Sequence, residues 1–135
     1  MIHATCLALN GQGILLTGPS GSGKSALGLQ LMAFGAHLIA DDQTVLDLRG
    51  DQVFASAPPQ IRGMIEARGV GILAAQAAPA TPVRLVIDMA QQEIDRLPQD
   101  RHTILLGQKI TLLHKVTYDH FPAAILQYIK GGRCA

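Results

Sequence analysis

Eight consecutive residues near the N-terminus match the pattern G-x-x-x-x-G-K-[ST] at every fixed position. They are Gly18, Pro19, Ser20, Gly21, Ser22, Gly23, Lys24 and Ser25. In this pattern, backbone N–H groups of the loop and of the first helical turn point at phosphate oxygens, where the helix dipole favours negative charge. Lys24 is expected to face solvent in the empty loop and to reach the β- and γ-phosphates, and Ser25 to bind Mg²⁺. The pattern therefore predicts a site for a nucleoside triphosphate or a close phosphate relative.

A second candidate for chemistry is a pair of carboxylates at the end of an apolar run. Residues 37–40 are expected to form a buried strand, which leads into Asp41 and Asp42. In nucleotide-binding sheets, an aspartate at such a strand end meets Mg²⁺ or accepts the proton of the attacking hydroxyl. Neighbouring residues point in different directions, so one aspartate can address metal while the other accepts a proton. The alternative is a charged turn that merely ends the strand.

The other polar candidates are weak when each is taken alone. Arg68 lies in a glycine-rich turn and Arg96 in a polar stretch, where an arginine is usually an exposed surface residue. A histidine near a chain end, such as His3, is usually solvated. Glu66 alone is typical of an exposed helix face. Only their order along the chain, together with the glycine-rich loop, gives them significance.

The elements that position these residues follow from apolar periodicity and turn residues. Residues 4–9 and 13–17 predict two strands joined at Asn10-Gly11, a favoured hairpin dipeptide. Residues 25–34 predict a helix whose Leu27, Leu31 and Phe34 share an apolar face and which ends near Gly35. Further expected elements are a hairpin over 45–55, a short amphipathic piece over 61–67, a loop over 74–82, strands over 83–89, 103–106 and 109–113, and a helix over 122–130. The expected class is α/β with a mostly β core, in a single domain over 1–135.

Composition narrows the class of protein. The chain has 135 residues, 48% of them apolar and 4% aromatic, with a formal net charge of +1. That charge offers no field to hold a polyanion, so a nucleic-acid partner is not expected. No apolar stretch approaches the ~20 residues of a membrane span. The N-terminus does not resemble a signal peptide. The two cysteines have no metal-ligand spacing, which favours reduced thiols and a cytoplasmic protein.

The order of these motifs resembles the catalytic domain of HPr kinase/phosphorylase, the bacterial enzyme that phosphorylates a serine of the phosphocarrier protein HPr. The resemblance runs from His3 to about Lys115. It includes the loop 18–25, the L-I-A-D-D run over 38–42, the A-P-P run over 57–59, an E-x-R-G-x-G-I signature over 66–72, the I-D-R-L run over 94–97 and the K-I-T run over 109–111.

The resemblance implies a protein serine kinase that uses ATP and Mg²⁺ to phosphorylate HPr and so regulates the phosphotransferase system. It implies ATP binding by 18–25, with Ser25, Glu66 and Asp41 at the metal. Asp42 matches the proton acceptor for the serine hydroxyl. The other active-site positions that it implies are His3, Lys24, Arg68 and Arg96. It also implies a P-loop-containing twisted mixed sheet with flanking helices, similar to the nucleotide-binding core of phosphoenolpyruvate carboxykinases, and a homohexamer.

Three departures from the family pattern modify these expectations. The chain starts almost at His3, which is similar to short, catalytic-domain-only forms of α-proteobacteria. Ala26 stands where an acidic residue often follows G-K-S. The P-V-x-x-G-R-N segment associated with dephosphorylation is absent, and residues 113–118 stand there, where Lys115 remains and His114 can partly substitute when protonated. Kinase activity is therefore expected, and phosphorylase activity is expected to be weak or undetectable. The alternatives are a small-molecule kinase and a non-catalytic nucleotide sensor.

Overall fold

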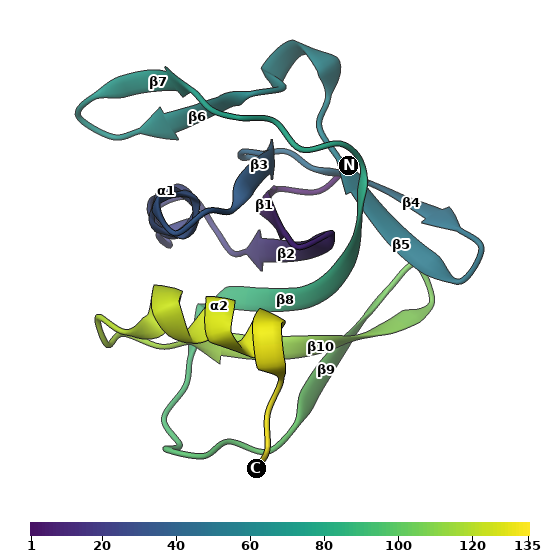
Figure 1. Cartoon of the computed structure of the whole chain (residues 1–135), viewed down its shortest axis with the longest axis vertical. Coiled ribbons are helices and arrows are strands. Elements are labelled where there is room, and N and C mark those ends of the chain that lie inside the picture. The colour runs from purple at the N-terminus through teal and green to yellow at the C-terminus, as the bar shows by residue number, and fades with distance from the viewer.

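A twisted mixed sheet lies at the centre of the computed structural model, which describes all residues from Met1 to Ala135 (Figure 1). Its main path has the order β3-β1-β2-β8-β10-β9. These strands are β1 (Ala4–Leu9), β2 (Gln12–Thr17), β3 (His37–Ala40), β8 (Thr81–Gln92), β9 (Arg101–Leu105) and β10 (Gln108–Lys115). Strands β2 and β10 run parallel to β8, and the other neighbours on the path are antiparallel. The predicted mixed α/β sheet is confirmed.

The predicted hairpin at Asn10-Gly11 joins β1 to β2. Both turn residues have positive φ, 53° at Asn10 and 71° at Gly11, as the favoured two-residue hairpin turns require. The turn fixes a register in which Ala4 lies opposite Thr17. The start of β1 and the end of β2 therefore meet at one edge of the sheet.

The same sheet edge collects the ends of several other strands. Thr17 pairs with Asp88 at the end of the parallel β2–β8 ladder, and His114 pairs with Asp88 from the other side. The end of β3 lies here too, because Ala40 pairs with Cys6 near the start of β1. Segments that follow β2, β3, β8 and β10, and the residues just before β1, are thus brought to one edge although they are far apart in sequence.

Two hairpins extend from the central sheet. Strands β4 (Val45–Arg49) and β5 (Gln52–Ser56) form the first, and β5 also pairs with the start of β8. Strands β6 (Met64–Ala67) and β7 (Gly71–Ala74) form a separate two-stranded sheet. Residues 61–67 therefore do not form the single amphipathic piece that was predicted. A short 3-10 helix, η1 (Pro59–Ile61), ends at Ile61, and β6 begins at Met64. In β6 the buried Ile65 and Ala67 alternate with exposed residues, which is the period of a strand.

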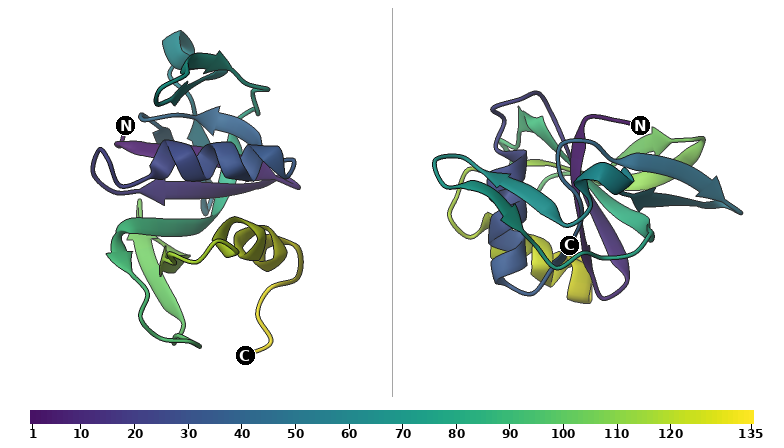
Figure 2. Two further views of the ribbon diagram at one scale, coloured as in Figure 1. Left: turned by 90° about the vertical axis from the view of Figure 1, so that its left-hand side faces the viewer. Right: turned by 90° about the horizontal axis from the view of Figure 1, so that it is seen from above.

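Helices α1 (Lys24–Ala33) and α2 (Phe121–Gly131) lie on the same side of the sheet (Figure 2). Alternation along β2 separates two apolar clusters: Ile14 and Leu16 face the helices, and Leu15 faces the opposite cluster. The helix-side cluster includes Leu27, Leu31 and Ile125. The opposite cluster includes residues of β5, such as Val53.

The apolar face of α1 differs from the prediction at one residue. Leu27 and Leu31 are buried, but Phe34 is 60% exposed, because the helix ends at Ala33 and Phe34 turns away as its C-cap. Gly28 lets the helix approach the sheet closely. A Cβ there would lie 3.3 Å from Thr5 Cγ2 and 3.4 Å from Leu7 Cδ2, so even alanine would require these side chains to move by a few tenths of an ångström.

Two further structural findings concern the cysteines and membrane association. Cys6 is buried in β1, Cys134 is exposed, and both are free thiols. Burial raises the pKa of the Cys6 thiol, which keeps it protonated and unreactive. Neither helix is long and apolar enough to span a bilayer.

Candidate active site

The glycine-rich loop joins β2 to α1 at the sheet edge. Gly18, Gly21 and Gly23 have φ values of 138°, 82° and 95°. At Gly18 a Cβ would also lie only 2.8 Å from Ser22 Oγ, so the loop needs glycine there. Helix α1 has no side-chain cap and no acidic residue in its first turn. Its first N–H groups therefore lack the side-chain acceptors that usually satisfy them, as an anion-binding helix start requires.

Lys24 is buried, in contrast to the solvent-facing side chain that the sequence predicts. It is 6% exposed, and its Nζ donates hydrogen bonds to the carbonyl oxygens of Gly18 (2.8 Å) and Pro19 (3.1 Å). The side chain folds back along the loop, where both carbonyl oxygens accept hydrogen bonds from its ammonium group. The ammonium group is thereby fixed inside the curve of the loop.

Asp41 is the central acceptor of the site and is 7% exposed. Its Oδ1 accepts hydrogen bonds from Ser25 Oγ (2.7 Å) and Thr5 Oγ1 (3.0 Å), and its Oδ2 accepts one from the Glu66 backbone N–H (2.9 Å). These contacts tie α1, β1 and β6 to the end of β3.

Asp42 points away from Asp41, as predicted for adjacent acids. Its φ of 69° is left-handed, a conformation that aspartate tolerates better than most residues. The Asp42 side chain is 66% exposed, and its Oδ1 lies 2.7 Å from His3 Nε2. One aspartate is thus buried against Ser25, and the other is accessible and paired with a histidine.

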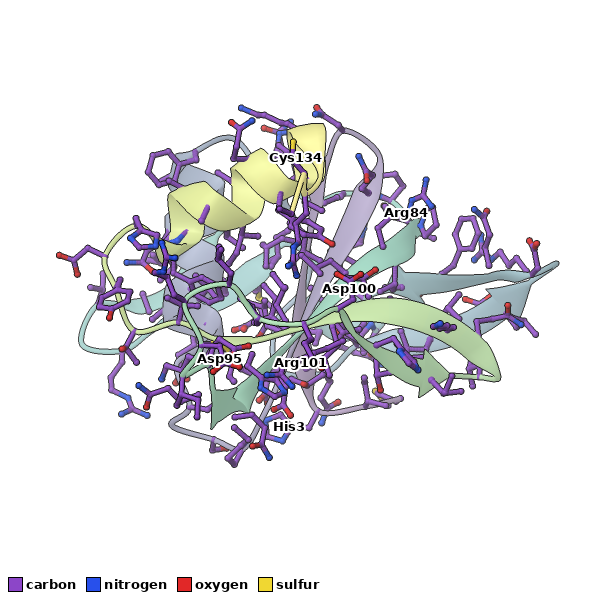
Figure 3. The ribbon with its side chains drawn as sticks, turned by 90° about the horizontal axis from the view of Figure 1, so that it is seen from below. His3, Arg84, Asp95, Asp100, Arg101 and Cys134 are labelled. Carbon is purple, nitrogen blue, oxygen red and sulfur yellow. The ribbon has the colours of Figure 1, made fainter.

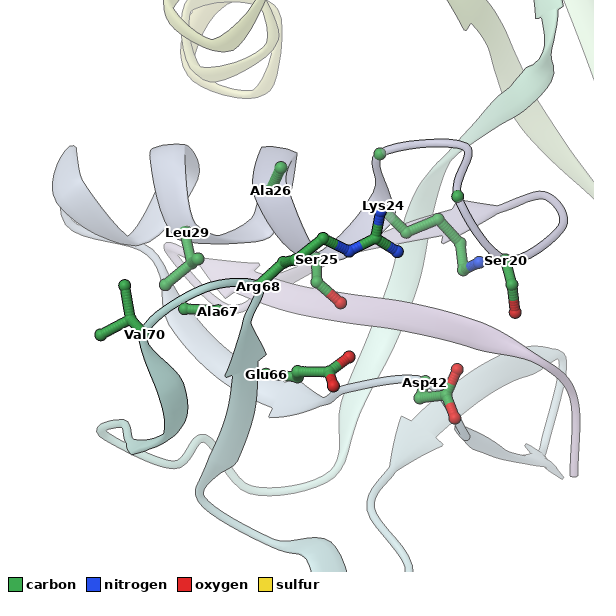
Figure 4. Close-up of a pocket in the computed structure, with 12 residues that line it drawn as sticks. Ser20, Lys24, Ser25, Ala26, Leu29, Asp42, Glu66, Ala67, Arg68 and Val70 are labelled. Atoms are coloured by element: carbon green, nitrogen blue, oxygen red, sulfur yellow. The ribbon is translucent and has the colours of Figure 1, made fainter.

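A pocket of about 530 Å³ lies between the start of α1 and the β6–β7 hairpin. Side chains of the loop and of the acidic cluster line it, among them Ser20, Lys24, Ser25, Asp42, Glu66 and Arg68 (Figure 4). Glu66 enters the pocket because its β6 neighbours Ile65 and Ala67 face the core. The topology therefore brings together the loop, both aspartates, Glu66 and Arg68, with His3 held beside them through Asp42.

Arg96 does not line this pocket, and unlike Asp41 and His3 it has no hydrogen bond or ion pair with a residue that does. It is exposed in the loop between β8 and β9. Glu93 fixes that loop: its carboxylate accepts hydrogen bonds from the N–H groups of Ile94 and Asp95 and from Nε and Nη2 of Arg101. Figure 3 labels Asp95, the residue before Arg96, and Arg101, the first residue of β9. The Arg101 guanidinium holds the pKa of Glu93 below its usual value.

The donor set fits Mg²⁺ by its chemistry. Ser25 Oγ and the carboxylates of Glu66 and Asp41 are hard oxygen ligands, which Mg²⁺ prefers alongside phosphate oxygens and water. The chain holds no cluster of three or more His, Cys, Asp or Glu side chains placed for a metal. Both Asp41 oxygens already accept protein donors, which suits Asp41 to orienting Ser25 or a metal-bound water.

Sequence reasoning missed Thr5 as a contributor to the site, and it named Lys115 without its contact with the glycine-rich loop. Thr5 is a fully buried polar residue in β1 whose hydroxyl donates to Asp41; a threonine inside an apolar strand was the available signal. Lys115, at the end of β10, donates from Nζ to the Ser22 carbonyl of the glycine-rich loop (3.1 Å). Only the parallel β8–β10 pairing brings Lys115 there.

Fold and site together define an α/β protein organised around a glycine-rich strand-to-helix loop with carboxylates beside it. The family model for the HPr Serine kinase C-terminal domain matches residues 1–116. The chain belongs to the HPr kinase family, as its resemblance in sequence predicted.

Individual relatives agree with this assignment. The chain is 35% identical over 122 residues to the HPr kinase/phosphorylase of Alkaliphilus metalliredigens, covering 81% of this chain and 40% of the relative. It is 36% identical over 122 residues to that of Burkholderia cenocepacia, covering 82% and 38%. The chain thus spans about two-fifths of the length of these relatives. The solved HPr(Ser) kinase/phosphatase structure from Coxiella burnetii superposes with a TM-score of 0.80 at 26% identity, covering 96% of this chain and 93% of that one.

Proposed function

We propose that this chain is an ATP- and Mg²⁺-dependent protein kinase that phosphorylates a serine of HPr. The observation that carries the proposal is one pocket lined by Lys24, Ser25, Asp42 and Glu66, with Asp41 hydrogen-bonded to Ser25 behind it. Family membership supports HPr as the substrate, because the relatives are named for it. The same membership supports regulation of the phosphotransferase system.

Each part of the site has a role in phosphoryl transfer, which depends on positioning and dispersed positive charge. Residues 18–25 bind the phosphates of ATP through their N–H groups. Lys24 moves from the Gly18 and Pro19 carbonyls to phosphate oxygens, which are stronger acceptors. Arg68, from the rim of the pocket, adds a second positive charge.

Asp42 is the proposed proton acceptor for the serine hydroxyl, since it is the accessible member of the acidic pair. His3 orients its carboxylate through the 2.7 Å contact. Ser25, Glu66 and Asp41 hold Mg²⁺, directly or through water. Bound there, Mg²⁺ neutralises charge on the phosphate oxygens. Arg96 joins this site only if the 93–100 loop moves toward the pocket or a neighbouring subunit supplies it.

We also propose three wider expectations that come from the sequence and its resemblance to the family. They are a P-loop core similar to that of phosphoenolpyruvate carboxykinases, a homohexamer and a cytoplasmic location. The test of the main proposal is incubation of the protein with ATP, Mg²⁺ and HPr, with mass spectrometry to detect phosphoserine. Product is expected with wild-type HPr and not with an HPr variant that lacks the acceptor serine.

A non-catalytic nucleotide sensor is the second candidate, favoured by one observation: Arg96 lies outside the pocket. A sensor would bind ATP, measured by calorimetry, without forming phosphoserine on HPr. Binding without turnover would therefore replace the kinase proposal with this one.

A further inference from the structure

A second cavity, of about 270 Å³, lies on the other side of the start of α1. It is enclosed by α1, by the end of β8 and by the segment from Lys115 to Pro122 that leads into α2. The first pocket already contains Asp42, Glu66 and the Lys24 side chain, and Asp41 lies behind it on Ser25. This second cavity contains none of the residues Asp41, Asp42 or Glu66 and has no role in the phosphoryl transfer described above.

The two cavities adjoin each other across the helix. They share Gly23 and Ala26. Ser25 and Leu29 face the first cavity, and Leu27 and Gln30 face the second, as expected for adjacent faces of a helix with 3.6 residues per turn. In Figure 4, Ala26 lies on one side of α1 and Glu66 lies on the opposite side. A ligand that lies on the glycine-rich loop can therefore extend into both.

The order of strands sets the direction of such a ligand. Asp41 and Asp42 follow β3, on one side of β2, and the second cavity includes residues of β8 and β10, on the other side. A nucleotide whose γ-phosphate lies beside Asp42 and Glu66 must direct its opposite end away from β3. That direction leads past Ala26 to the second cavity.

The lining suits a flat heteroaromatic group. Leu27, Met89 and Phe121 give apolar walls. Tyr118 stacks on His120, with ring centroids 5.6 Å apart and planes 25° apart, and Tyr118 lines the cavity with an exposed side chain. Aromatic faces of this kind stack on nucleobases.

Polar groups at the cavity can recognise a base edge. Gln30, Thr117 and Asp119 line it and offer amide, hydroxyl and carboxylate groups. The carboxylate of Asp119 is an acceptor for the amino or ring N–H groups of a purine. Cavities for whole drug-sized ligands start at about 300 Å³, so a volume of about 270 Å³ fits the base of a nucleotide rather than a second complete substrate.

We propose that the cavity between α1 and residues 115–122 binds the purine base of the nucleotide whose phosphates lie on the glycine-rich loop. This inference rests on the proposed nucleotide-binding function of that loop. It adds Gln30, Tyr118 and Asp119 to the site as residues that select and orient the nucleotide.

The test compares Mg²⁺-ATP with Mg²⁺-tripolyphosphate, which has the phosphate chain but no nucleoside, by isothermal titration calorimetry. ATP is expected to bind wild type about tenfold or more tightly than tripolyphosphate, because only ATP stacks in the cavity.

Gln30→Trp, which fills the cavity from an exposed helix position, is expected to lower ATP affinity to that of tripolyphosphate and leave tripolyphosphate affinity unchanged. Tyr118→Ala is expected to act in the same direction without adding bulk. Gln127→Trp, at an exposed position of α2 outside both cavities, is the matched control.

The outcomes separate this inference from the function it rests on. Equal binding of the two ligands by wild type, or unchanged ATP affinity in both Gln30→Trp and Tyr118→Ala, would overturn the base site and leave the phosphate loop intact. Failure of wild type to bind either ligand would overturn the nucleotide-binding function, and the base site with it.

Discussion

The Ser25 hydroxyl donates a 2.7 Å hydrogen bond to Asp41 Oδ1, which joins the first turn of α1 to the residue that follows β3. Strand β1 separates β3 from β2 in the sheet, so this bond spans the region between the glycine-rich loop and the acidic strand end. It fixes the Ser25 oxygen beside the pocket that contains Lys24, Asp42 and Glu66. Asp41 therefore positions Ser25, whereas the accessible Asp42 is the proposed proton acceptor. Substitutions at the two residues can distinguish these roles.

Asp41→Asn should destabilise the protein by about 1–3 kcal/mol, because an amide presents one acceptor atom and one donor where three donors now converge. Asp42→Asn, at an exposed pair with His3, should cost less than about 1 kcal/mol. Urea unfolding of both variants measures the free energies. Equal losses would mean that the Asp41 hydrogen bonds contribute nothing specific to stability.

Asp42→Asn should retain ATP binding and reduce HPr phosphorylation by about 10²–10⁴-fold, the usual contribution of a general base. The amide has nearly the same shape but cannot accept the hydroxyl proton. Initial rates at saturating ATP measure the effect. A larger loss of rate in Asp41→Asn, at a temperature where both variants are folded, would assign the base to Asp41 instead.

Lys24→Ala should abolish ATP-dependent phosphorylation, with a loss of more than about 10²-fold, because the other cation at the loop, Lys115, is bound to the Ser22 carbonyl and not to those of Gly18 and Pro19. Since Lys24 is buried on two carbonyls, a stability loss of about 1–2 kcal/mol should accompany it. Lys130→Ala, at an exposed position of α2, is the control and should change neither quantity. Turnover like that of wild type would exclude this loop as the catalytic site.

Glu93→Gln should reduce the acid sensitivity of folding. The pKa of Glu93 lies below its usual value of 4.5 because Arg101 and backbone N–H groups bind the charged form. Its contribution to stability is therefore present above about pH 4.5 and is lost as pH falls through the lower folded pKa. The free energy of unfolding should fall less between neutral and acidic pH in Glu93→Gln than in wild type, whereas Asp51→Asn, an exposed tip residue of the β4–β5 hairpin, should follow wild type. Parallel curves for all three proteins would contradict a role for Glu93 in holding the loop.

Phosphate-driven dephosphorylation of phosphoserine-HPr should be weak or undetectable. This reaction must hold an incoming anion beside an already charged phosphoprotein, and two anions within about 4–6 Å repel unless positive groups compensate them. Lys115 is directed at the Ser22 carbonyl, and Thr117 and Tyr118 carry no charge. Pyrophosphate release from phosphoserine-HPr, Mg²⁺ and phosphate provides the assay. A rate comparable to the forward reaction would show that the 113–118 segment supports the reverse reaction as it stands.

The sequence by itself determined the local elements and the composition of the site. The glycine-rich loop, the hairpin at Asn10-Gly11, the run into Asp41-Asp42 and the terminal helix depend on short-range geometry, which is readable from spacing and turn residues. The order of motifs also identified the family. The amphipathic pattern over 61–67 did not show that β6 begins only at Met64, because a four-residue strand and a helical turn have similar apolar patterns over so short a length.

Only the tertiary structure decided which candidates meet. Strand register brings Thr5, Ser25 and the Glu66 N–H to Asp41, and it leaves Arg96 outside the pocket. The parallel β8–β10 pairing also carries Lys115 to the glycine-rich loop. These relationships link residues far apart in the chain, and their distances follow from sheet order and side-chain packing. Sequence spacing carries no information about either.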